Sequence, residues 1–561
     1  MNLKAAPFYL SDEDINWVTT TLESMSLEEK IGQLFCPIGY STEPEYLQNA
    51  LLNMHIGGLF FRDGLGEEMQ KTFEYAQTHS RIPLLIPSNL EAGGDGAAMD
   101  GTAYSKQLGV AATGDKKYAY RLGKIACTEA SALGINWAFA PVVDIDRNYH
   151  NPITNVRTYG DSPDTVVTFA AEYMRAAKEC DVAVSIKHFP GDGIDERDQH
   201  LLTSVNSLNM EEWDDTFGKV YQHLIDAGAL TVMAGHIAMP AYQEYYNEET
   251  KGKIVPATLS KELLQNLLRD KLGFQGLIIT DATPMVGFAV AMAREYSVPT
   301  AIEAGCDMFL FNRDLSEDFK YMMDGYKNGI LSEKRLLEAN TRILATKAAL
   351  KLHSKQRAGK LVPEKEALKI LRCKQHVEWA KEVADKAITL VKDTQNILPI
   401  SAKKTKRVLL EVLGHFPSND RVLSSVKKNL EEKGFTVIPY EKEEFDKGVD
   451  NVTAFKEKYD LVIYIGNYEN ASNQTTNRIN WYTFWGMGNN VPWFVEEVPT
   501  IFVSVANPYH LLDVPMIKTY INCYSNNEYV LDSVVNKLCG ESAFTGISPI
   551  DPYCGREELK L

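Results

Sequence analysis

Long apolar runs are absent from this sequence of 561 residues. No stretch approaches the roughly 20 consecutive apolar residues that a membrane-spanning helix needs. The opening residues MNLKAAPFYLSDEDINW have no basic segment followed by an apolar core, so we expect no secretory signal. We therefore expect a protein without a membrane partner, and the cytoplasm is the simplest location.

Paired cysteines are also missing. The eight cysteines are scattered, and none forms the Cys-x-x-Cys pair of zinc and redox sites. The histidines show no His-x3-His spacing, and no Gly-x-Gly-x-x-Gly follows a predicted strand, which argues against zinc and against a dinucleotide. We expect neither a metal nor a cofactor, and the scattered cysteines fit a reducing compartment.

Basic residues are too few for a nucleic-acid partner. The chain has 58 Lys and Arg against 75 Asp and Glu, a net charge of −17, whereas nucleic-acid phosphates require a basic face. Hydrophobic residues make up 45% and charged residues 24%, which is typical of a globular protein. A chain of this length is expected to contain two or more domains.

Short apolar runs alternate with helical patterns over about the first 350 residues. The runs are rich in Val, Ile, Leu and Phe without strict alternation, which is typical of strands buried on both faces. Eight strand–helix units of this kind predict an α/β fold, a (β/α)8 TIM-type barrel rather than an open doubly wound sheet. The expected strands are 34–39, 57–61, 83–88, 136–144, 182–189, 229–235, 276–282 and 307–311.

The pattern changes after residue 352. The expected elements are then a helix at 377–393, strands at 407–414, 436–440, 461–466, 500–507 and 519–525, and a helix at 421–434. This order predicts a smaller α/β sandwich domain that is mostly parallel. We expect the barrel to span residues 1–352, a linker and connecting helix 353–383, and the second domain 384–561.

Polar side chains gather at the carboxyl ends of the expected strands, where a barrel carries its chemistry. Candidates follow the third to seventh strands: Asn89 and Glu91, then Arg157, Lys187 and His188, His236, and Asp281. Amides, cations and carboxylates at one mouth suit a small polyhydroxylated ligand such as a sugar.

Several of these residues also have a purely structural explanation. Asp144 and Asp146, after the fourth strand, favour capping or pinning a loop. His236 could be a hydrogen-bonded core histidine, and Arg157 could pair with a loop carboxylate. A lysine that directly follows an apolar strand is costly to bury unless it is paired or faces a wet pocket, so Lys187 favours a functional role.

The segment KHFPGDGIDERDQH, residues 187–200, resembles the KHFPG-x-G…D-x-H signature of glycoside hydrolase family 3, in its β-N-acetylglucosaminidase branch. Further segments resemble the same family, and together they sample most of residues 26–400. They include SLEEKIGQLF (26–35), LLIPSNLEAGG (84–94), GINWAFAPVVDID (134–146) and LGFQGLIITDATPM (272–285).

The resemblance implies a retaining exo-hydrolase that releases terminal β-linked N-acetylglucosamine from small glycans or cell-wall fragments. Asp281 would be the nucleophile, and Asp198 with His200 would form the acid/base dyad. The resemblance implies Arg157, Lys187 and His188 as sugar ligands. The position of Asn89, Glu91 and His236 at strand ends makes them further candidate ligands. Two positions depart from the family pattern: Asn89 replaces a usual Asp, and Asp192 stands where His is common.

The spacing of Asp198 and His200 permits a hydrogen bond that orients the imidazole, as in a catalytic triad. An imidazole has an ordinary pKa of about 6.5, which suits proton transfer at neutral pH. Gly191 and Gly193 provide backbone freedom, so we expect a mobile loop that closes over bound sugar.

Three alternatives stay open at this point. A β-glucosidase-like hydrolase of the same family would take its acid/base carboxylate from the second domain. A phosphorylase acting on N-acetylglucosaminides is compatible with the dyad, because a neutral imidazole repels an incoming phosphate less than a carboxylate does. A sugar-binding protein without catalysis is the third. In each case we expect a small-molecule carbohydrate ligand and a monomer or homodimer.

Overall fold

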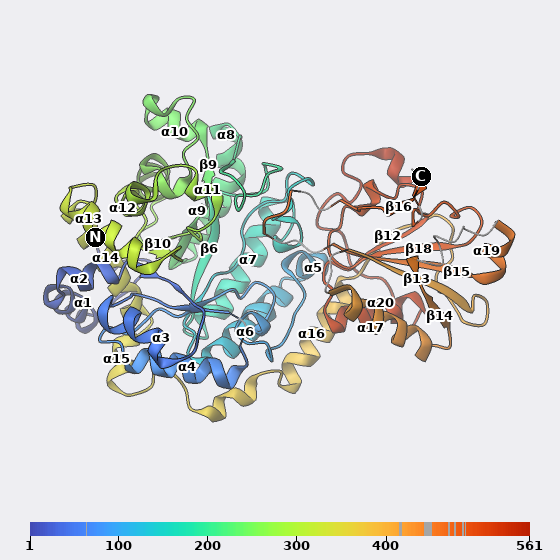
Figure 1. Cartoon of the computed structure of the whole chain (residues 1–561), viewed down its shortest axis with the longest axis horizontal. Coiled ribbons are helices and arrows are strands. Elements are labelled where there is room, and N and C mark those ends of the chain that lie inside the picture. Colours follow the sequence, from blue (N-terminus) through green and yellow to red (C-terminus); the bar gives the residue numbers. More distant parts are fainter. Residues whose placement is uncertain are drawn as a thin grey trace. The chain divides into compact units, whose positions relative to one another are not determined.

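The structure is a computed structural model, and it describes residues 1–62, 64–414, 418–442, 452–468, 472–475, 478–484, 487–488 and 490–561. The chain forms two compact units (Figure 1). The first contains residues 1–103, 119–151 and 161–376, and the second contains 104–118, 152–160 and 377–561. The segments 104–118 and 152–160 both lie inside the range 1–352 that the sequence assigned to the barrel.

Parallel strand pairing runs in a closed ring through the first unit. β1 (Phe35–Cys36) pairs with β11 (Phe309–Leu310), and a bridge from Met308 to Ile279 continues to β10 (Leu277–Thr280). The ladder then passes through β8 (Thr231–Ala234), β6 (Ala183–Phe189), β5 (Trp137–Ala138) and β4 (Pro87–Ser88). A bridge from Leu85 to Gly58 leads to β3 (Phe60–Phe61), which pairs with β2 (Ile38–Gly39), the continuation of β1.

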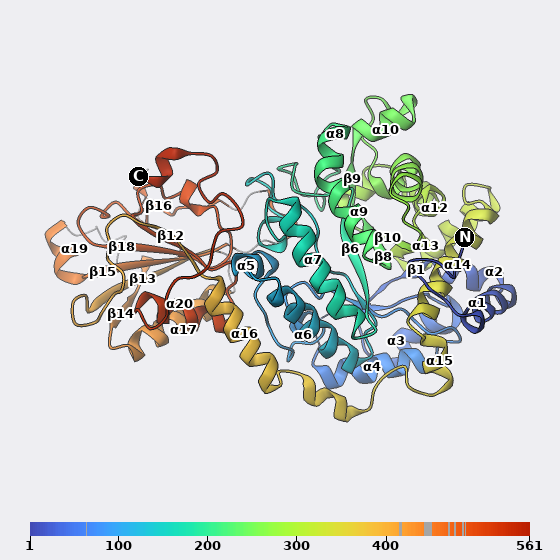
Figure 2. The ribbon, with the colours of Figure 1, turned by 180° about the vertical axis from the view of Figure 1, so that it is seen from behind.

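This ring is the predicted TIM-type barrel. The strands of this ring lie inside the eight expected segments and are shorter than expected; β6 comes within one residue of its expected segment 182–189 and is buried along its whole length. Helices and helical turns connect successive strands on the outside, and α6 and α7 lie beside one another in both views (Figure 2). The helices of this unit are α1 (Asp12–Ser24), α2 (Leu27–Gly32), α3 (Pro44–Gln48), α4 (Gly66–Thr78), α6 (Lys117–Leu133), α7 (Pro163–Lys178), α8 (Met210–Trp213), α9 (Lys219–Asp226), α10 (Pro240–Tyr246), α11 (Val286–Ala289), α12 (Arg294–Ala304), α13 (Leu315–Lys327), α14 (Glu333–Ala349) and α15 (Leu352–Arg357).

Two features of the first unit lie outside the predicted strands. The segment Glu262–Lys271, which precedes β10, is π-helical. Beyond the barrel ladder, β7 (Ser204–Val205) and β9 (Ile237–Ala238) form a short parallel pair. This pair ties the chain after the KHFPG loop to the chain after β8, so the loops above the barrel are connected to each other.

The second unit is built on a six-stranded sheet in the order β12-β19-β18-β15-β13-β14. All neighbours are parallel except β12 and β19. Tyr464, Phe502 and Tyr520 are register neighbours whose rings stack with centroids 6.2 and 5.5 Å apart. The elements are α5 (Gln107–Ala112), α16 (Lys374–Ala387), β12 (Thr389–Asp393), β13 (Arg407–Gly414), α17 (Ser418–Glu432), β14 (Thr436–Pro439), α19 (Val452–Lys458), β15 (Leu461–Asn467), β16 (Thr483–Phe484), β17 (Met487–Gly488), β18 (Thr500–Ser504), β19 (Thr519–Asn522) and α20 (Glu528–Leu538).

The expected helix at 377–393 is wrong in its last six residues. The helix α16 ends at Ala387, and residues 389–393 form the antiparallel edge strand β12. Thr389 and Val391 are β-branched residues that favour a strand, and the unpaired edge of β19 supplies the hydrogen-bonding partner. Tertiary pairing therefore overrides the helical pattern of the preceding residues.

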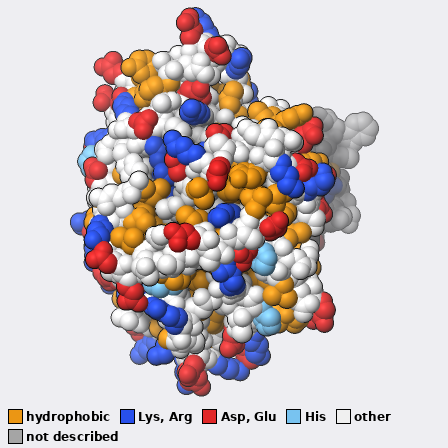
Figure 3. All heavy atoms as spheres, turned by 90° about the vertical axis from the view of Figure 1, so that its left-hand side faces the viewer, with side chains coloured by type: hydrophobic (Ala, Val, Ile, Leu, Met, Phe, Trp, Pro, Cys, Tyr) orange, Lys and Arg blue, Asp and Glu red, His pale blue; other side chains and the backbone are white. Residues whose placement is uncertain are grey.

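Among the described residues, no helix combines the length and the apolar composition needed to cross a bilayer. The face of the molecule in Figure 3 carries Lys and Arg side chains interspersed with Asp and Glu. That face therefore lacks the continuous positive surface by which proteins bind nucleic acid.

Asp307 is a fully buried carboxylate just before β11, at the amino end of the strand. It pairs with Arg269 at 2.8 Å and Arg335 at 3.0 Å, with Arg342 3.4 Å away, and it accepts the backbone N–H of Ile278. Burial alone would raise the pKa of Asp307, but the three guanidinium groups outweigh burial and lower it. The cluster ties α14 and the segment 262–271 to β10 and β11.

Asp307→Asn should lower the free energy of unfolding of the barrel by about 3–5 kcal/mol, because it leaves buried guanidinium groups without their charged partner. Urea unfolding followed by circular dichroism would measure this loss. Asp324→Asn is the matched control: its carboxylate pairs with Lys320 on the surface and should leave the unfolding midpoint unchanged. Equal midpoints for the two variants would contradict the assignment.

Candidate active site

Lys187 and His188 lie near the carboxyl end of β6 and are both buried. The Lys187 Nζ atom is 2.6 Å from Glu91 Oε1, so the cost of burying the ammonium is offset by a carboxylate. His188 Nδ1 is 2.7 Å from Asp144 Oδ2 and Nε2 is 3.9 Å from Asp281 Oδ2. Because an ionised carboxylate only accepts, Nδ1 carries a proton and Nε2 faces Asp281.

Asp144 is the buried carboxylate that orients His188. Besides the imidazole, it accepts the backbone N–H of His188 at 3.0 Å and that of Asp192 at 2.8 Å. Burial alone would raise its pKa, but His188 and these N–H donors outweigh burial, so the pKa of Asp144 lies below its ordinary value. Its pinning role agrees with the structural explanation suggested by the sequence.

Asp281 follows β10 and keeps part of its side chain, 13%, exposed. Its Oδ1 accepts the backbone N–H of Ala282 at 2.7 Å. Burial alone would raise the pKa of Asp281, but the imidazoles of His188, His236 and His200 and the Ala282 N–H outweigh burial and lower it. The group is thus an ionised, partly accessible carboxylate at the mouth of the barrel, which is the form a nucleophile needs.

Asp198 and His200 form the hydrogen bond that their spacing permits. Oδ1 of the buried Asp198 lies 2.7 Å from His200 Nδ1 and also accepts the His200 backbone N–H at 2.8 Å. Nδ1 is therefore the donor, and Nε2 is the nitrogen left for proton transfer. The imidazole is 26% exposed. The arrangement can move a proton at Nε2 while Asp198 stabilises the charged ring.

The backbone brings this dyad to the segment that follows Asp281. The N–H groups of Val286 and Gly287, at the start of α11, donate to the carbonyls of His200 and Gln199 at 3.1 Å each. The chain between residues 198 and 200 is therefore fixed against the β10 end of the barrel.

Gly191 and Gly193 have a different role from the expected one. Their φ values are +120° and +104°, a region that favours glycine. A Cβ atom at Gly191 would lie 2.1 Å from the Phe217 ring, and one at Gly193 would lie 2.0 Å from the Ile145 carbonyl oxygen. The two glycines thus permit a tight, packed turn, and within residues 191–200 only the Glu196 and Arg197 side chains are exposed. Closure of the loop over sugar stays a prediction.

His236 is fully buried beside the end of β8. Its Nδ1 lies 3.0 Å from the Thr258 hydroxyl and its Nε2 lies 3.0 Å from the Ala282 carbonyl oxygen, so Nε2 donates and Nδ1 accepts. Burial lowers the pKa of His236 to about 4. Both ring nitrogens are engaged by protein groups, which favours the core-histidine explanation over direct sugar binding.

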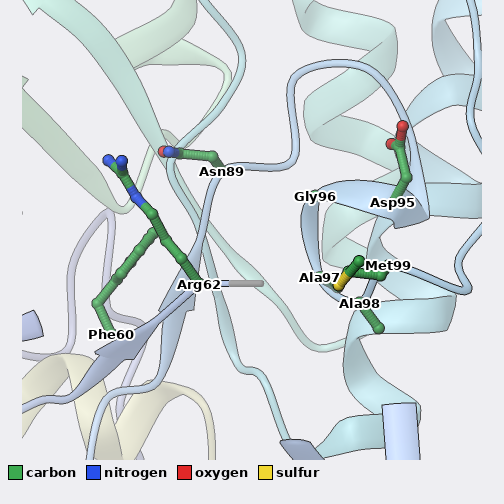
Figure 4. Close-up of a pocket in the computed structure, with 8 residues that line it drawn as sticks. All are labelled: Phe60, Arg62, Asn89, Asp95, Gly96, Ala97, Ala98 and Met99. Carbon is green, nitrogen blue, oxygen red and sulfur yellow. The ribbon is translucent and has the colours of Figure 1, made fainter. Parts of the chain in front are cut away.

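Asn89 lines a hollow of about 310 Å³ together with Arg62 and the chain 95–99. In Figure 4 the Arg62 and Asn89 side chains lie on one side of the hollow, and Asp95 and Met99 lie on the other. The Arg62 guanidinium lies 5.5 Å from the Phe60 ring centroid. Arg62 was not among the predicted site residues, although it directly follows the second strand and the same strand-end rule applies to it.

Arg157 belongs to the second compact unit, where it ends the short helical turn Asn155–Arg157. Its Nη1 atom is 3.4 Å from the Ile153 carbonyl oxygen. The structure therefore brings Asp144, His188, Asp281 and the Lys187–Glu91 pair together in the first unit, while the role of Arg157 as a sugar ligand stays a prediction.

Residues 26–346 match the protein family described as "Glycosyl hydrolase family 3 N terminal domain". The chain belongs to glycosyl hydrolase family 3 and is a glycoside hydrolase.

Similar proteins cover most or all of this chain. It is 44% identical to a "Beta-N-acetylglucosaminidase/beta-glucosidase" of Cellulomonas fimi over 100% of both chains. It is 28% identical to "Beta-hexosaminidase A" of Pseudoalteromonas piscicida over 65% of this chain and 64% of that protein. Among solved structures, "Beta-glucoside phosphorylase BglX bound to 2FGlc" matches 99% of both chains with a TM-score of 0.93 and 42% identity. A family 3 β-N-acetylglucosaminidase from Paenibacillus sp. str. FPU-7, at 22% identity and a TM-score of 0.78 over 94% of this chain and 99% of that one, shares the fold.

His236 should make the protein less stable in mild acid. Its pKa of about 4 in the folded state lies below the ordinary value of 6.5, so the unfolded chain binds a proton first as the pH falls. The free energy of unfolding should decline from pH 6.5 towards 4 by up to about 1.4 kcal/mol per pH unit. His236→Gln, whose amide can still donate to the Ala282 carbonyl, should lack this part of the slope. Identical pH slopes in urea unfolding would contradict the prediction.

Proposed function

We propose that this chain cleaves terminal β-linked N-acetylglucosamine or glucose from small glycans with retention of configuration. Asp281 is the nucleophile, and His200, oriented by Asp198, is the general acid/base. The observation that carries the proposal is the hydrogen bond between His200 Nδ1 and Asp198, which leaves Nε2 available near an ionised Asp281. The two sugars follow from the name of the Cellulomonas fimi relative.

The reaction proceeds in two steps. First, Asp281 attacks the anomeric carbon and the glycosidic bond breaks, while His200 Nε2 gives its proton to the leaving oxygen. The products are a glycosyl ester on Asp281 and the free alcohol. Second, the neutral Nε2 takes a proton from the acceptor, whose oxygen displaces the carboxylate from the anomeric carbon. Asp281 and the protonated His200 are thereby restored.

The sugar lies against the carboxyl end of β6 in this proposal. Lys187 and His188, near the end of β6, and Asn89 and Glu91, after β4, offer hydrogen bonds to its hydroxyls. The 2.7 Å contact between His188 and Asp144 favours a fixed imidazole, which lowers the cost of ordering the site when sugar binds.

Phosphate is a second candidate for the acceptor. Its support is the 42% identity over 99% of both chains to a solved β-glucoside phosphorylase. The acid/base chemistry also favours it, because a neutral imidazole in the second step repels a phosphate anion less than an acid/base carboxylate does.

His200→Gly should reduce kcat/KM according to the leaving group. For phenyl glycosides, whose oxygen needs a proton, the loss should be about 10²-fold or more. For dinitrophenyl glycosides, whose leaving group departs as an anion, the loss should be less than about tenfold. Comparing aryl β-glucosides with aryl β-N-acetylglucosaminides in the same assay identifies the preferred sugar. A loss that is the same for all leaving groups would rule out the acid/base role.

A slow fluorosugar substrate should leave a glycosyl adduct on Asp281, detectable by mass spectrometry of peptides. If phosphate is the acceptor, adding it should speed the loss of the adduct and yield a sugar phosphate, whereas sulfate at the same ionic strength should not. Release at equal rates in both salts would identify water as the acceptor. An adduct on another residue would overturn the nucleophile assignment.

A further inference from the structure

Asp192 is a buried carboxylate that the proposed reaction does not use. Its backbone N–H donates to Asp144 Oδ1 at 2.8 Å, and its carbonyl accepts the Ile145 N–H. Its Oδ1 accepts from the Gly193 N–H at 2.7 Å and from the Asn151 amide at 2.9 Å. Its Oδ2 accepts from the Gln199 amide at 3.3 Å. The side chain therefore accepts hydrogen bonds from three donors.

Retaining this carboxylate has an energetic cost. Burial and the neighbouring Asp144 raise the pKa of Asp192 to about 7, against the opposing effects of His188 and the donors on its own oxygens. A neutral Asn would occupy the same volume without a buried charge. The presence of an ionisable group here indicates a need for two accepting oxygens.

Gln199 is the residue between the two members of the dyad, and its side chain is buried. Its Nε2 donates to Asp192, while its Oε1 accepts the backbone N–H of His236 at 2.8 Å. Its carbonyl accepts the Gly287 N–H. Both ends of the amide and the backbone are thus bonded, so residue 199 has little freedom to shift.

The connection continues to the nucleophile. His236 Nε2 lies 3.0 Å from the carbonyl oxygen of Ala282, the residue after Asp281. A continuous series of hydrogen bonds therefore runs from Asp192 through Gln199 and His236 to Ala282. It links the ends of β6, β8 and β10 with the loop that carries the acid/base.

We propose that Asp192 and Gln199 are positioning residues that hold the Asp198–His200 dyad at a fixed place relative to Asp281. The inference rests on the proposed function, since it assigns these residues to the proton-transfer step. Proton transfer requires the acid within hydrogen-bond reach of the leaving oxygen, so loosening residue 199 moves His200 out of reach.

Each hydrogen bond in this series has a fixed donor and a fixed acceptor. A double variant can therefore reverse one bond without changing the net charge. The amide of Gln199 must turn its nitrogen to Asp192 and its oxygen to His236, because the partners are an acceptor and a donor. Asp192→Asn sets an amide nitrogen against the Gln199 nitrogen. Gln199→Glu sets a carboxylate against Asp192. The double variant Asp192→Asn/Gln199→Glu reverses the hydrogen bond, and the new carboxylate still accepts from the His236 N–H.

Each single variant should lower kcat/KM for phenyl glycosides by about tenfold to a hundredfold, because a displaced acid forfeits part of the contribution of acid–base catalysis. The loss for dinitrophenyl glycosides should be no more than about threefold. The double variant should recover phenyl glycoside activity to within about threefold of the unsubstituted protein. Assays about one pH unit above the pKa of Asp192 keep its carboxylate ionised.

Glu196→Gln is the matched control, since it removes an exposed carboxylate from the same loop, and its activity should be unchanged. Urea unfolding of the unsubstituted protein, the two single variants and the double variant tests folding and the coupling between residues 192 and 199 independently of catalysis. Losses that are equal for both leaving groups, or a double variant no better than the single ones, would overturn the inference. If His200→Gly shows no leaving-group dependence, the acid/base assignment of His200 is itself wrong, and so is the inference that rests on it. Coupling between residues 192 and 199 that is seen only in unfolding would then show that Asp192 and Gln199 have a purely structural role.

Discussion

The carboxylate of Asp144 holds the carboxyl end of β6 in place. It accepts hydrogen bonds from the His188 ring Nδ1–H and from the backbone N–H groups of His188 and Asp192. One buried charge therefore sets both the orientation of the His188 ring and the start of the following loop. The segment 142–144 can do this because Val142 bridges to Lys187 in a parallel register. The remaining site geometry depends on this constraint: His188 faces Asp281, and the loop leaves the barrel in the direction of the dyad.

Buried charges have different tasks at the two ends of the barrel strands. At the amino end of β11, Asp307 is surrounded by three guanidinium groups and an N–H donor, which serve stability. At the carboxyl ends, Asp281 retains an exposed edge, and among the described residues its charge is balanced by the imidazoles of His188, His236 and His200. A carboxylate whose two oxygens are both paired with arginine would be a poor nucleophile. The partly exposed carboxylate of Asp281 is better suited to nucleophilic attack.

Several predictions from sequence rest on short-range rules and are confirmed. The eight strands lie where buried apolar runs were found, because parallel strands covered on both faces need such runs. The Asp-x-His spacing permits a hydrogen bond, since two residues on a turning chain bring the side chains within reach, and that bond is present. The helix expected at 377–393 is wrong in its last six residues because the antiparallel pairing of β12 with β19 is a long-range contact that no local pattern reveals.

The sequence by itself determined the order of strands, the chemical groups at their ends and the dyad within the loop, because each depends on neighbours along the chain. It did not determine which polar groups face sugar and which face each other. Asp192, which departs from the family pattern, is a buried acceptor for Asn151 and Gln199, and the ring nitrogens of His236 bond to Thr258 and Ala282. The tertiary structure decided these roles, since hydrogen bonds between strand ends exist only after the barrel has closed.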